Sequence, residues 1–259
     1  MSTTTLAAPI RVNTAGVHAR PSLGRLVAVE LRKMVDTRAG FWVQVATVAI
    51  TVVAVIVRCV VGDAADHTFA SVLYVGLQPA AVLLPIVGIL IVTSEWSQRT
   101  GLITFALVPV RSRVLGAKLI ASVVLAGAML VMSVAVAAAG VLVAAPGIDG
   151  TWSDLAPLIG QSTVYVIAAM VTGVAFGAIL LASAPAIVAN FAVPTVWVAL
   201  ASLPVFAGVA PWLDPALDGM SEEVLSLSQW AHAGTALAVW MLLPLVIGAW
   251  RITRREVTA

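Results

Sequence analysis

The amino-acid sequence predicts an all-α membrane protein with six transmembrane helices. Of its 259 residues, 61% are hydrophobic and 10% are charged, whereas a soluble globular domain is about 25% charged. A water-soluble fold of this size could not hide so much apolar surface, so the bilayer must act as its solvent. Two further observations agree with this reading: the apolar residues form six separate stretches, and the basic residues gather on one side of them.

Each apolar stretch is long enough to cross a bilayer. A helix rises about 1.5 Å per residue and the hydrocarbon core is about 30 Å thick, so a span needs about 20 mostly apolar residues. The predicted spans are residues 41–61, 69–93, 119–145, 157–182, 185–209 and 230–250. They make up a predicted transmembrane domain over residues 41–250.

Two segments precede the first span. Residues 1–21 are predicted to form a polar cytoplasmic tail, because they lack the apolar run that a cleavable signal peptide needs. Residues 22–40 are predicted to form an amphipathic connecting helix in the cytoplasmic interface, since their apolar and basic residues fall on opposite faces at 100° per residue. Glu30 projects onto the apolar face. It either snorkels to the edge of the membrane or pairs with a base of the next cytoplasmic segment, such as Arg99.

The charges predict the topology, because basic residues near span ends favour the cytoplasm. Thirteen of the 14 basic residues fall on one side, and Arg58 is the exception. They are Arg11, Arg20, Arg25, Arg32, Lys33 and Arg38 before the first span, Arg99, Arg111, Arg113 and Lys118 after the second, and Arg251, Arg254 and Arg255 in the tail 251–259. Both termini are therefore predicted to be cytoplasmic, as an even number of spans requires.

Two connections carry more pattern than a simple linker. The cytoplasmic segment 94–118 opens with a charged cluster, continues as a short apolar helix, breaks at Pro109 and re-enters the membrane after Lys118. The external connection 210–229 is the longest and most acidic. Its apolar residues suggest short helices in the outer interface.

The sequence lacks the motifs of an enzyme. It contains no phosphate-binding loop, HExxH, Cys-x-x-Cys or GxSxG pattern, its three histidines are scattered, and Cys59 is its one cysteine. We therefore predict no catalytic residue, no metal site and no cofactor bound by this chain. The centres of the six spans carry no ionisable residue, which a proton- or sodium-coupled carrier usually needs. If the protein moves a substrate uphill, we expect the energy to enter from outside the membrane domain.

The segment 94–118 resembles the signature region of ABC-2 type transporter permeases. That family has an acidic residue, a Gly-Thr pair, an apolar helix, Pro-x-x-Arg and a Lys opening the third span. The corresponding residues are Glu95, Arg99-Thr100-Gly101, the apolar run 102–107, Pro109 with Arg111 and Arg113, and Lys118. The Thr-Gly order is reversed, and the Pro–Arg spacing is one residue shorter. The helix before the first span, the six spans and the long external connection also resemble this family.

The resemblance implies an exporter subunit of the bacterial inner membrane. It implies a dimer with a second copy or a homologous permease, and a separate ATPase subunit that binds ATP and Mg²⁺; no nucleic acid is expected. The implied ATPase-coupling residues are Glu95, Trp96, Gln98, Arg99, Thr100, Gly101, Pro109 and Arg111, and those of the connecting helix are Glu30, Arg32 and Lys33.

The resemblance also implies a substrate pathway, a cleft at the dimer axis lined by the second and fifth spans. The candidate residues are Tyr74, Gln78, Pro79, Asn190, Phe191, Pro194 and Thr195. Alternatively, Gln78 and Asn190 only form hydrogen bonds between helices, and the prolines only kink their spans. Gly173 and Gly177 are predicted to mark a close helix contact. The pathway candidates are mostly apolar, which weakly favours a hydrophobic or amphipathic substrate.

Other functions stay open. A secondary carrier or channel would need no ATPase, and a permease-like sensor or scaffold would move nothing. An intramembrane enzyme would need a catalytic pair, and none is visible in the sequence. A neighbouring gene that encodes a Walker A motif would separate the exporter from these alternatives.

Overall fold

The computed structural model describes residues 22–61, 67–97, 111–147, 151–215, 217, 220 and 223–254. Every regular element within these ranges is helical, and six spans are long and apolar enough to cross a membrane. They are α2 (Arg38–Val60), α3 (Phe69–Ser97), α5 (Arg111–Ala144), α6 (Leu155–Leu180), α7 (Ser183–Ala201) and a composite last span. The last span consists of α8 (Leu227–Leu237), the π-helical turn η6 (Ala238–Leu242) and α9 (Leu243–Arg254). The prediction of a six-span, all-helical membrane protein is thus confirmed.

The predicted connecting helix 22–40 is divided in two. Helix α1 (Leu23–Asp36) begins at Ser22, whose hydroxyl accepts a hydrogen bond from the Arg25 N–H at 3.3 Å. It ends at Thr37, which has an extended backbone and caps α2 by accepting from the Gly40 N–H at 3.2 Å. A side chain on Gly40 would collide with the Met34 carbonyl, so glycine permits the sharp bend between the two helices.

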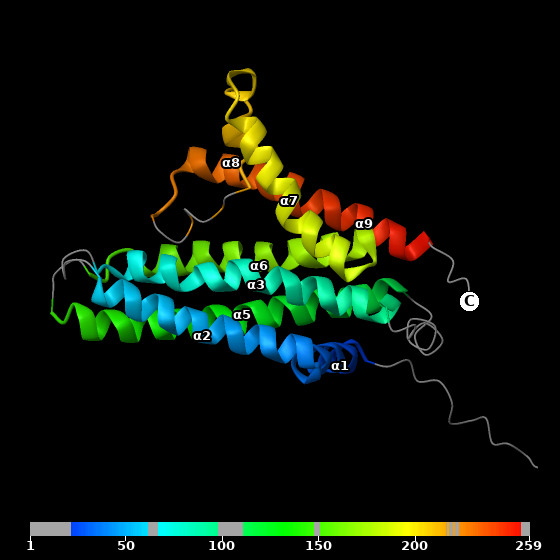
Figure 1. Cartoon of the computed structure of the whole chain (residues 1–259), viewed down its shortest axis with the longest axis horizontal. Helices are drawn as coiled ribbons and strands as arrows, with labels where there is room; N and C mark the ends of the chain where they lie inside the picture. Colours follow the sequence, from blue (N-terminus) through cyan, green and yellow to red (C-terminus); the bar gives the residue numbers. More distant parts are fainter. Residues whose placement is uncertain are drawn as a thin grey trace, which may run out of the picture.

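The helices α2, α3, α5 and α6 lie side by side as a four-helix body (Figure 1). Helices α3 and α6 are the most buried spans, because each packs against several others. Helix α7 leaves this body at an angle and is the least buried span (Figure 1). It ends at Ala201, short of the range 185–209 expected from the sequence, and two 3₁₀ turns follow: η3 (Pro204–Phe206) and η4 (Ala210–Trp212).

Glycines allow α3 and α6 to touch backbone to backbone. A Cβ on Gly173 would fall on the Pro85 backbone, and one on Gly177 would come within 3.1 Å of the Ile89 backbone. From the facing helix, a Cβ on Gly88 would lie 2.5 Å from the Met170 carbonyl oxygen. The predicted close contact at Gly173 and Gly177 is confirmed. Small residues let helices approach in lipid, where packing drives association.

The segments that the charge pattern places in the cytoplasm meet at one end of the body. Helix α1, the last turn of α3, the first turn of α5 and the last turn of α9 all lie there (Figure 1). The side chain of Arg111 donates to the Ile252 carbonyl at 3.2 Å, and that of Arg251 donates to the Ile179 carbonyl. We call this the α1 end; its assignment to the cytoplasm remains a prediction.

Candidate functional site

Four charged side chains form a compact cluster at the α1 end. They are Glu30 and Lys33 of α1, Glu95 of α3 and Lys118 of α5, and we call them the charge cluster. Lys33 Nζ lies 2.7 Å from Glu30 Oε1 and 2.9 Å from Glu95 Oε1. Lys118 Nζ lies 2.8 Å from Glu30 Oε2 and 3.1 Å from Glu95 Oε1. Two positive and two negative groups thus tie three helices together without net charge.

Three members of the cluster are buried and have hydrogen-bond partners, whereas the Lys33 side chain is 39% exposed. Glu30, Glu95 and Lys118 are 4%, 6% and 4% exposed. Besides its two carboxylate partners, Lys118 donates to the Ile91 carbonyl at 2.9 Å, so each of its three N–H bonds has an acceptor. The chain contains only two lysines, and both belong to this cluster. An ammonium group can bridge carboxylates in a tetrahedral arrangement that a planar guanidinium does not match.

Electrostatics keeps Lys33 charged. Burial lowers the pKa of Lys33, whereas the hydrogen bond and negative charge of Glu30, together with those of Glu95, raise it. The net pKa lies above the ordinary value of 10.5. Removing one member of such a cluster would leave a buried charge without its partner, which typically costs 3–5 kcal/mol. The cluster therefore acts as a rigid connection between α1, α3 and α5.

The structure decides the open question about Glu30. The prediction that it snorkels is wrong, because the carboxylate is buried and pairs with bases. The long-range base is Lys118 of α5. Arg99, the base named from the sequence, lies outside the described residues.

The predicted coupling residues divide into two groups. Glu95, Trp96 and Arg111 line one small recess beside Lys118. Gln98, Thr100, Gly101 and Pro109 lie outside the described residues, as does Arg99. Of the connecting-helix candidates, Glu30 and Lys33 join the charge cluster, whereas Arg32 is exposed on α1.

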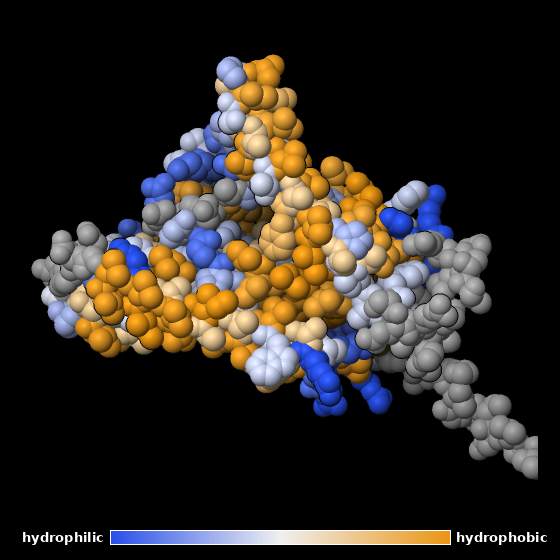
Figure 2. All heavy atoms as spheres, viewed as in Figure 1, coloured by the Kyte–Doolittle hydropathy of each residue, from blue (hydrophilic) through white to orange (hydrophobic). Residues whose placement is uncertain are grey.

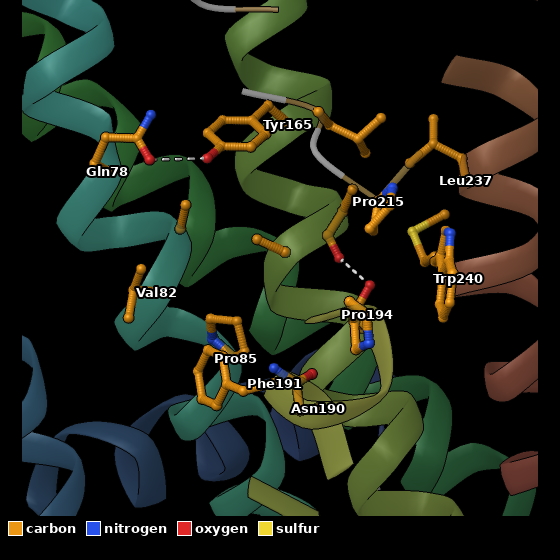
Figure 3. Close-up of a pocket in the computed structure, with 16 residues that line it drawn as sticks. Gln78, Val82, Pro85, Tyr165, Asn190, Phe191, Pro194, Pro215, Leu237 and Trp240 are labelled. Carbon is orange, nitrogen blue, oxygen red and sulfur yellow. Dashed lines mark hydrogen bonds between the residues drawn. The ribbon is translucent and has the colours of Figure 1, made fainter. Parts of the chain in front are cut away.

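A cavity of about 280 Å³ lies between α3, α6, α7 and η6 (Figure 3). Four of the seven predicted pathway residues line it: Gln78, Asn190, Phe191 and Pro194. The other three, Tyr74, Pro79 and Thr195, do not. Pro79 is buried in α3, Tyr74 is half-buried, and the exposed Thr195 returns its hydroxyl to the Phe191 carbonyl of its own helix at 2.7 Å.

Two polar atoms at this cavity are buried without a hydrogen-bond partner: Gln78 Nε2 and Asn190 Oδ1. The other end of the Gln78 amide is engaged, because the Tyr165 hydroxyl donates to Gln78 Oε1 at 3.5 Å (Figure 3). The interhelical hydrogen bond proposed as the alternative role for Gln78 thus exists for its oxygen and leaves its nitrogen unused. Buried polar groups normally find a partner, so a ligand or water in the cavity would satisfy these atoms once either amide turned toward it.

Sequence reasoning missed several lining residues. Tyr165 of α6 and the pair Trp240–Met241 of η6 complete the cavity wall. The π-helical turn places Trp240 and Met241 on the wall, and such turns often occur at functional sites. A tryptophan deep in an apolar span was the available signal for residue 240. Nothing in the local sequence marked Tyr165, because its role depends on its neighbour in α3.

Described residues of the external connection lie beside the cavity and bond to α6 and η6. Gln161 of α6 donates to the carbonyls of Met220 at 2.9 Å and Glu223 at 2.8 Å, and its Oε1 accepts from the Leu225 N–H at 2.9 Å. Trp240 Nε1 donates to the Leu213 carbonyl at 2.9 Å. From this connection, Pro215 and Leu217 line the cavity. We call its described part, residues 213–225 with gaps at 216, 218–219 and 221–222, the cover segment.

A comparison with models of protein families finds none that matches this chain, and a comparison with curated proteins finds no match either.

Proposed function

We propose that this chain is the permease subunit of an ATP-driven exporter of the ABC-2 type. It works as a dimer with a second copy or a homologous permease, and a separate ATPase subunit binds ATP and Mg²⁺. The observation that carries this proposal is that a single helix, α3, reaches both candidate sites. Its residues Gln78 and Pro85 line the cavity, and its residue Glu95 belongs to the charge cluster.

The geometry of α3 allows a movement at the charge cluster to reach the cavity. From residue 78 to residue 95, α3 rises about 25 Å. The charge cluster joins α3 to α1 and to α5, on either side of the segment that the family resemblance assigns to ATPase docking. A push on that segment would therefore move the ends of α1, α3 and α5 together rather than bend one helix.

Two of the helices that line the cavity, α3 and α7, differ in how tightly they are packed against the rest of the protein. Helix α3 packs closely against α6, whereas α7 is the least buried of the six spans. A displacement of α3 and α6 relative to α7 would change the width of the cavity. ATP binding to the partner subunit can then bias the permease between two states of access, since a ligand shifts an equilibrium by its different affinity for the two states.

The placement of ionisable groups favours an external energy source. The charge cluster lies at the α1 end of the spans, and the central parts of the spans carry no Asp, Glu, Lys, Arg or His in the sequence. A secondary carrier usually keeps such a group at mid-membrane for proton or ion coupling. This contrast favours the exporter subunit over the carrier, and reconstitution separates it from a sensor or scaffold.

The test is to search the neighbouring genes for one that encodes a Walker A ATPase, and then to co-purify and reconstitute its product with this chain. We expect a stable complex, and ATP hydrolysis that rises when the permease is present in liposomes. Arg99→Ala should uncouple hydrolysis from transport while membrane insertion stays normal. Arg254→Ala, an exposed basic residue at the end of α9 that belongs to none of the proposed coupling residues, is the matched control and should behave like wild type.

Glu95→Ala should also uncouple hydrolysis from transport, but it removes a member of the charge cluster and so needs a stability measurement beside it. Absence of any ATPase in the purified complex, or full transport by Arg99→Ala, would refute the proposed coupling.

A further inference from the structure

We propose that the cavity between α3, α6, α7 and η6 binds an uncharged, mostly apolar small molecule that carries a hydrogen-bond acceptor near one end and a donor near the other. This inference rests on the proposed function, because it names the substrate class of the same pathway. It is carried by the volume of the cavity, the absence of charge on its described walls, and the two unpartnered polar atoms.

Volume limits the ligand. Pockets for drug-sized molecules measure about 300–1,000 Å³, so a cavity of about 280 Å³ lies at the lower limit of that range. A whole phospholipid or a folded peptide does not fit inside it. A compact molecule of two or three fused rings is the scale of ligand that the cavity can enclose.

The residues that line the cavity and the depth of the cavity in the membrane both exclude a charged ligand. Among the described residues that line the cavity, none is acidic or basic, and three are aromatic: Tyr165, Phe191 and Trp240. Asn190 lies about 10 Å along α7 from its first residue, which places the cavity at hydrocarbon depth. An ion at this depth without a partner would cost several kcal/mol, so a neutral ligand is strongly preferred.

The polar atoms define two ends. Figure 3 shows Gln78 and Tyr165 at one end of the cavity and Asn190 with Phe191 and Pro85 at the other. From residue 78 to residue 85, α3 rises about 10 Å, which sets the approximate separation of the ends. Gln78 Nε2 is a donor that needs an acceptor, and Asn190 Oδ1 is an acceptor that needs a donor. Asn190 is 7% exposed, so bulk solvent does not satisfy it.

The cavity is open toward the apolar surface. Figure 2 shows the surface hollowed beside α7, with hydrophobic residues on the α7 side of the hollow and more hydrophilic residues on the opposite side. On the other side, the cover segment is held by Gln161 and Trp240. A ligand that partitions into the bilayer can therefore reach the cavity sideways, along α7.

The test uses a matched pair of fluorescent probes on the purified full chain in detergent. The neutral probe is 6-propionyl-2-naphthol at pH 6, with a carbonyl acceptor and a hydroxyl donor at opposite ends of a rigid ring system. The charged probe is 6-hydroxy-2-naphthalenesulfonate, which keeps the ring and hydroxyl but carries a permanent negative charge. Energy transfer from tryptophan to the neutral probe reports its saturable binding, and the sulfonate is added as a competitor whose affinity is read from displacement of the neutral probe.

We expect the neutral probe to bind saturably and the sulfonate to bind at least tenfold more weakly. Ala169→Phe fills the cavity and should weaken binding of the neutral probe at least tenfold. Ala135→Phe adds the same volume on an exposed face of α5 and should change binding less than twofold. Gln78→Leu and Asn190→Leu should each weaken binding about five- to tenfold, the loss of one hydrogen bond.

Equal binding of the two probes, or unchanged binding by Ala169→Phe, would overturn the proposal. Unchanged binding by both leucine variants would overturn the assignment of the two polar ends. If Ala169→Phe does not fold, the proposal is still tested by comparing the two probes and by the two leucine variants. The assay contains no ATPase, so its failure leaves the exporter proposal standing, and failure to find an ATPase leaves the binding result standing.

Discussion

The charge cluster allows a sharp test of how the α1 end is held together. Lys118→Met removes an ammonium group that lies 2.8 Å from Glu30 and 3.1 Å from Glu95, and it leaves two buried carboxylates facing Lys33 alone. Glu30→Leu leaves an excess positive charge instead. Each single variant should lower the free energy of unfolding by about 3–5 kcal/mol, the usual cost of a buried charge that loses its partner.

The double variant Glu30→Leu/Lys118→Met should be far more stable than the sum of the single variants. It removes one charge of each sign and leaves the pair Lys33–Glu95, whose atoms lie 2.9 Å apart. Replacing a buried ion pair with apolar residues is often close to neutral, so we expect a loss within about 2 kcal/mol. The coupling energy between the two positions should therefore be at least about 4 kcal/mol.

The assay is equilibrium unfolding in mixed micelles, with increasing denaturing detergent and tryptophan fluorescence as the signal. Arg32→Leu is the control on the same helix; because Arg32 is exposed, its effect should stay within about 0.5 kcal/mol. Single variants that each cost less than about 1 kcal/mol, or a double variant equal to their sum, would show that the cluster is not a connected unit.

Three further predictions concern packing, the cover segment and pH. Gly173→Ala should lower the melting temperature, because the added Cβ would meet the Pro85 backbone. Gly127→Ala is the control and should leave the melting temperature unchanged, because there is open space around Gly127. An unchanged melting temperature in Gly173→Ala would disprove the close contact. Gln161→Leu should speed hydrogen exchange in the cover segment, because it removes three hydrogen bonds to that segment. The control is Thr163→Val, which removes a hydroxyl that bonds only within α6 and should leave the exchange unchanged. Equal exchange rates in the two variants would mean that Gln161 does not hold the cover segment. The pKa of Lys33 is raised above 10.5, so the charged lysine contributes its full stability below pH 10.5 and loses that contribution as pH rises through the raised pKa. The melting temperature of the wild type should therefore fall over that pH range, and the melting temperature of Lys33→Met should not show this fall.

Much of the fold could be predicted because lipid restricts the choices. With no water to satisfy backbone groups, apolar stretches of sufficient length must form helices, so the spans followed from length and hydropathy. The bend at Thr37 was missed, since it depends on a local capping hydroxyl and the close approach of Gly40 to Met34 rather than on hydropathy. The shorter α7 was missed because the residues that follow it are as apolar as the helix itself.

The candidate sites were only partly predictable. Gln78 and Asn190 stood out because polar residues in apolar spans are rare, and both line the cavity. Tyr165 did not stand out, because it became a wall residue only when α6 packed beside α3. For Glu30, the sequence offered pairing with a base of the cytoplasmic segment 94–118, with Arg99 as the example; the base of that segment that the structure pairs with Glu30 is Lys118.

The sequence by itself determined that this chain has six segments long and apolar enough to span a membrane, that its basic residues fall almost entirely in one set of the connections between them, and that the centres of these segments carry no charge. These properties depend on composition along the chain, because the transfer of each segment into lipid is decided by its own residues. Only the tertiary structure decided which charges meet, which polar atoms stay unpartnered and where a cavity remains. Those properties arise between helices distant in sequence: Glu30 and Lys118 pair across 88 residues, and Gln161 holds backbone groups about 60 residues away.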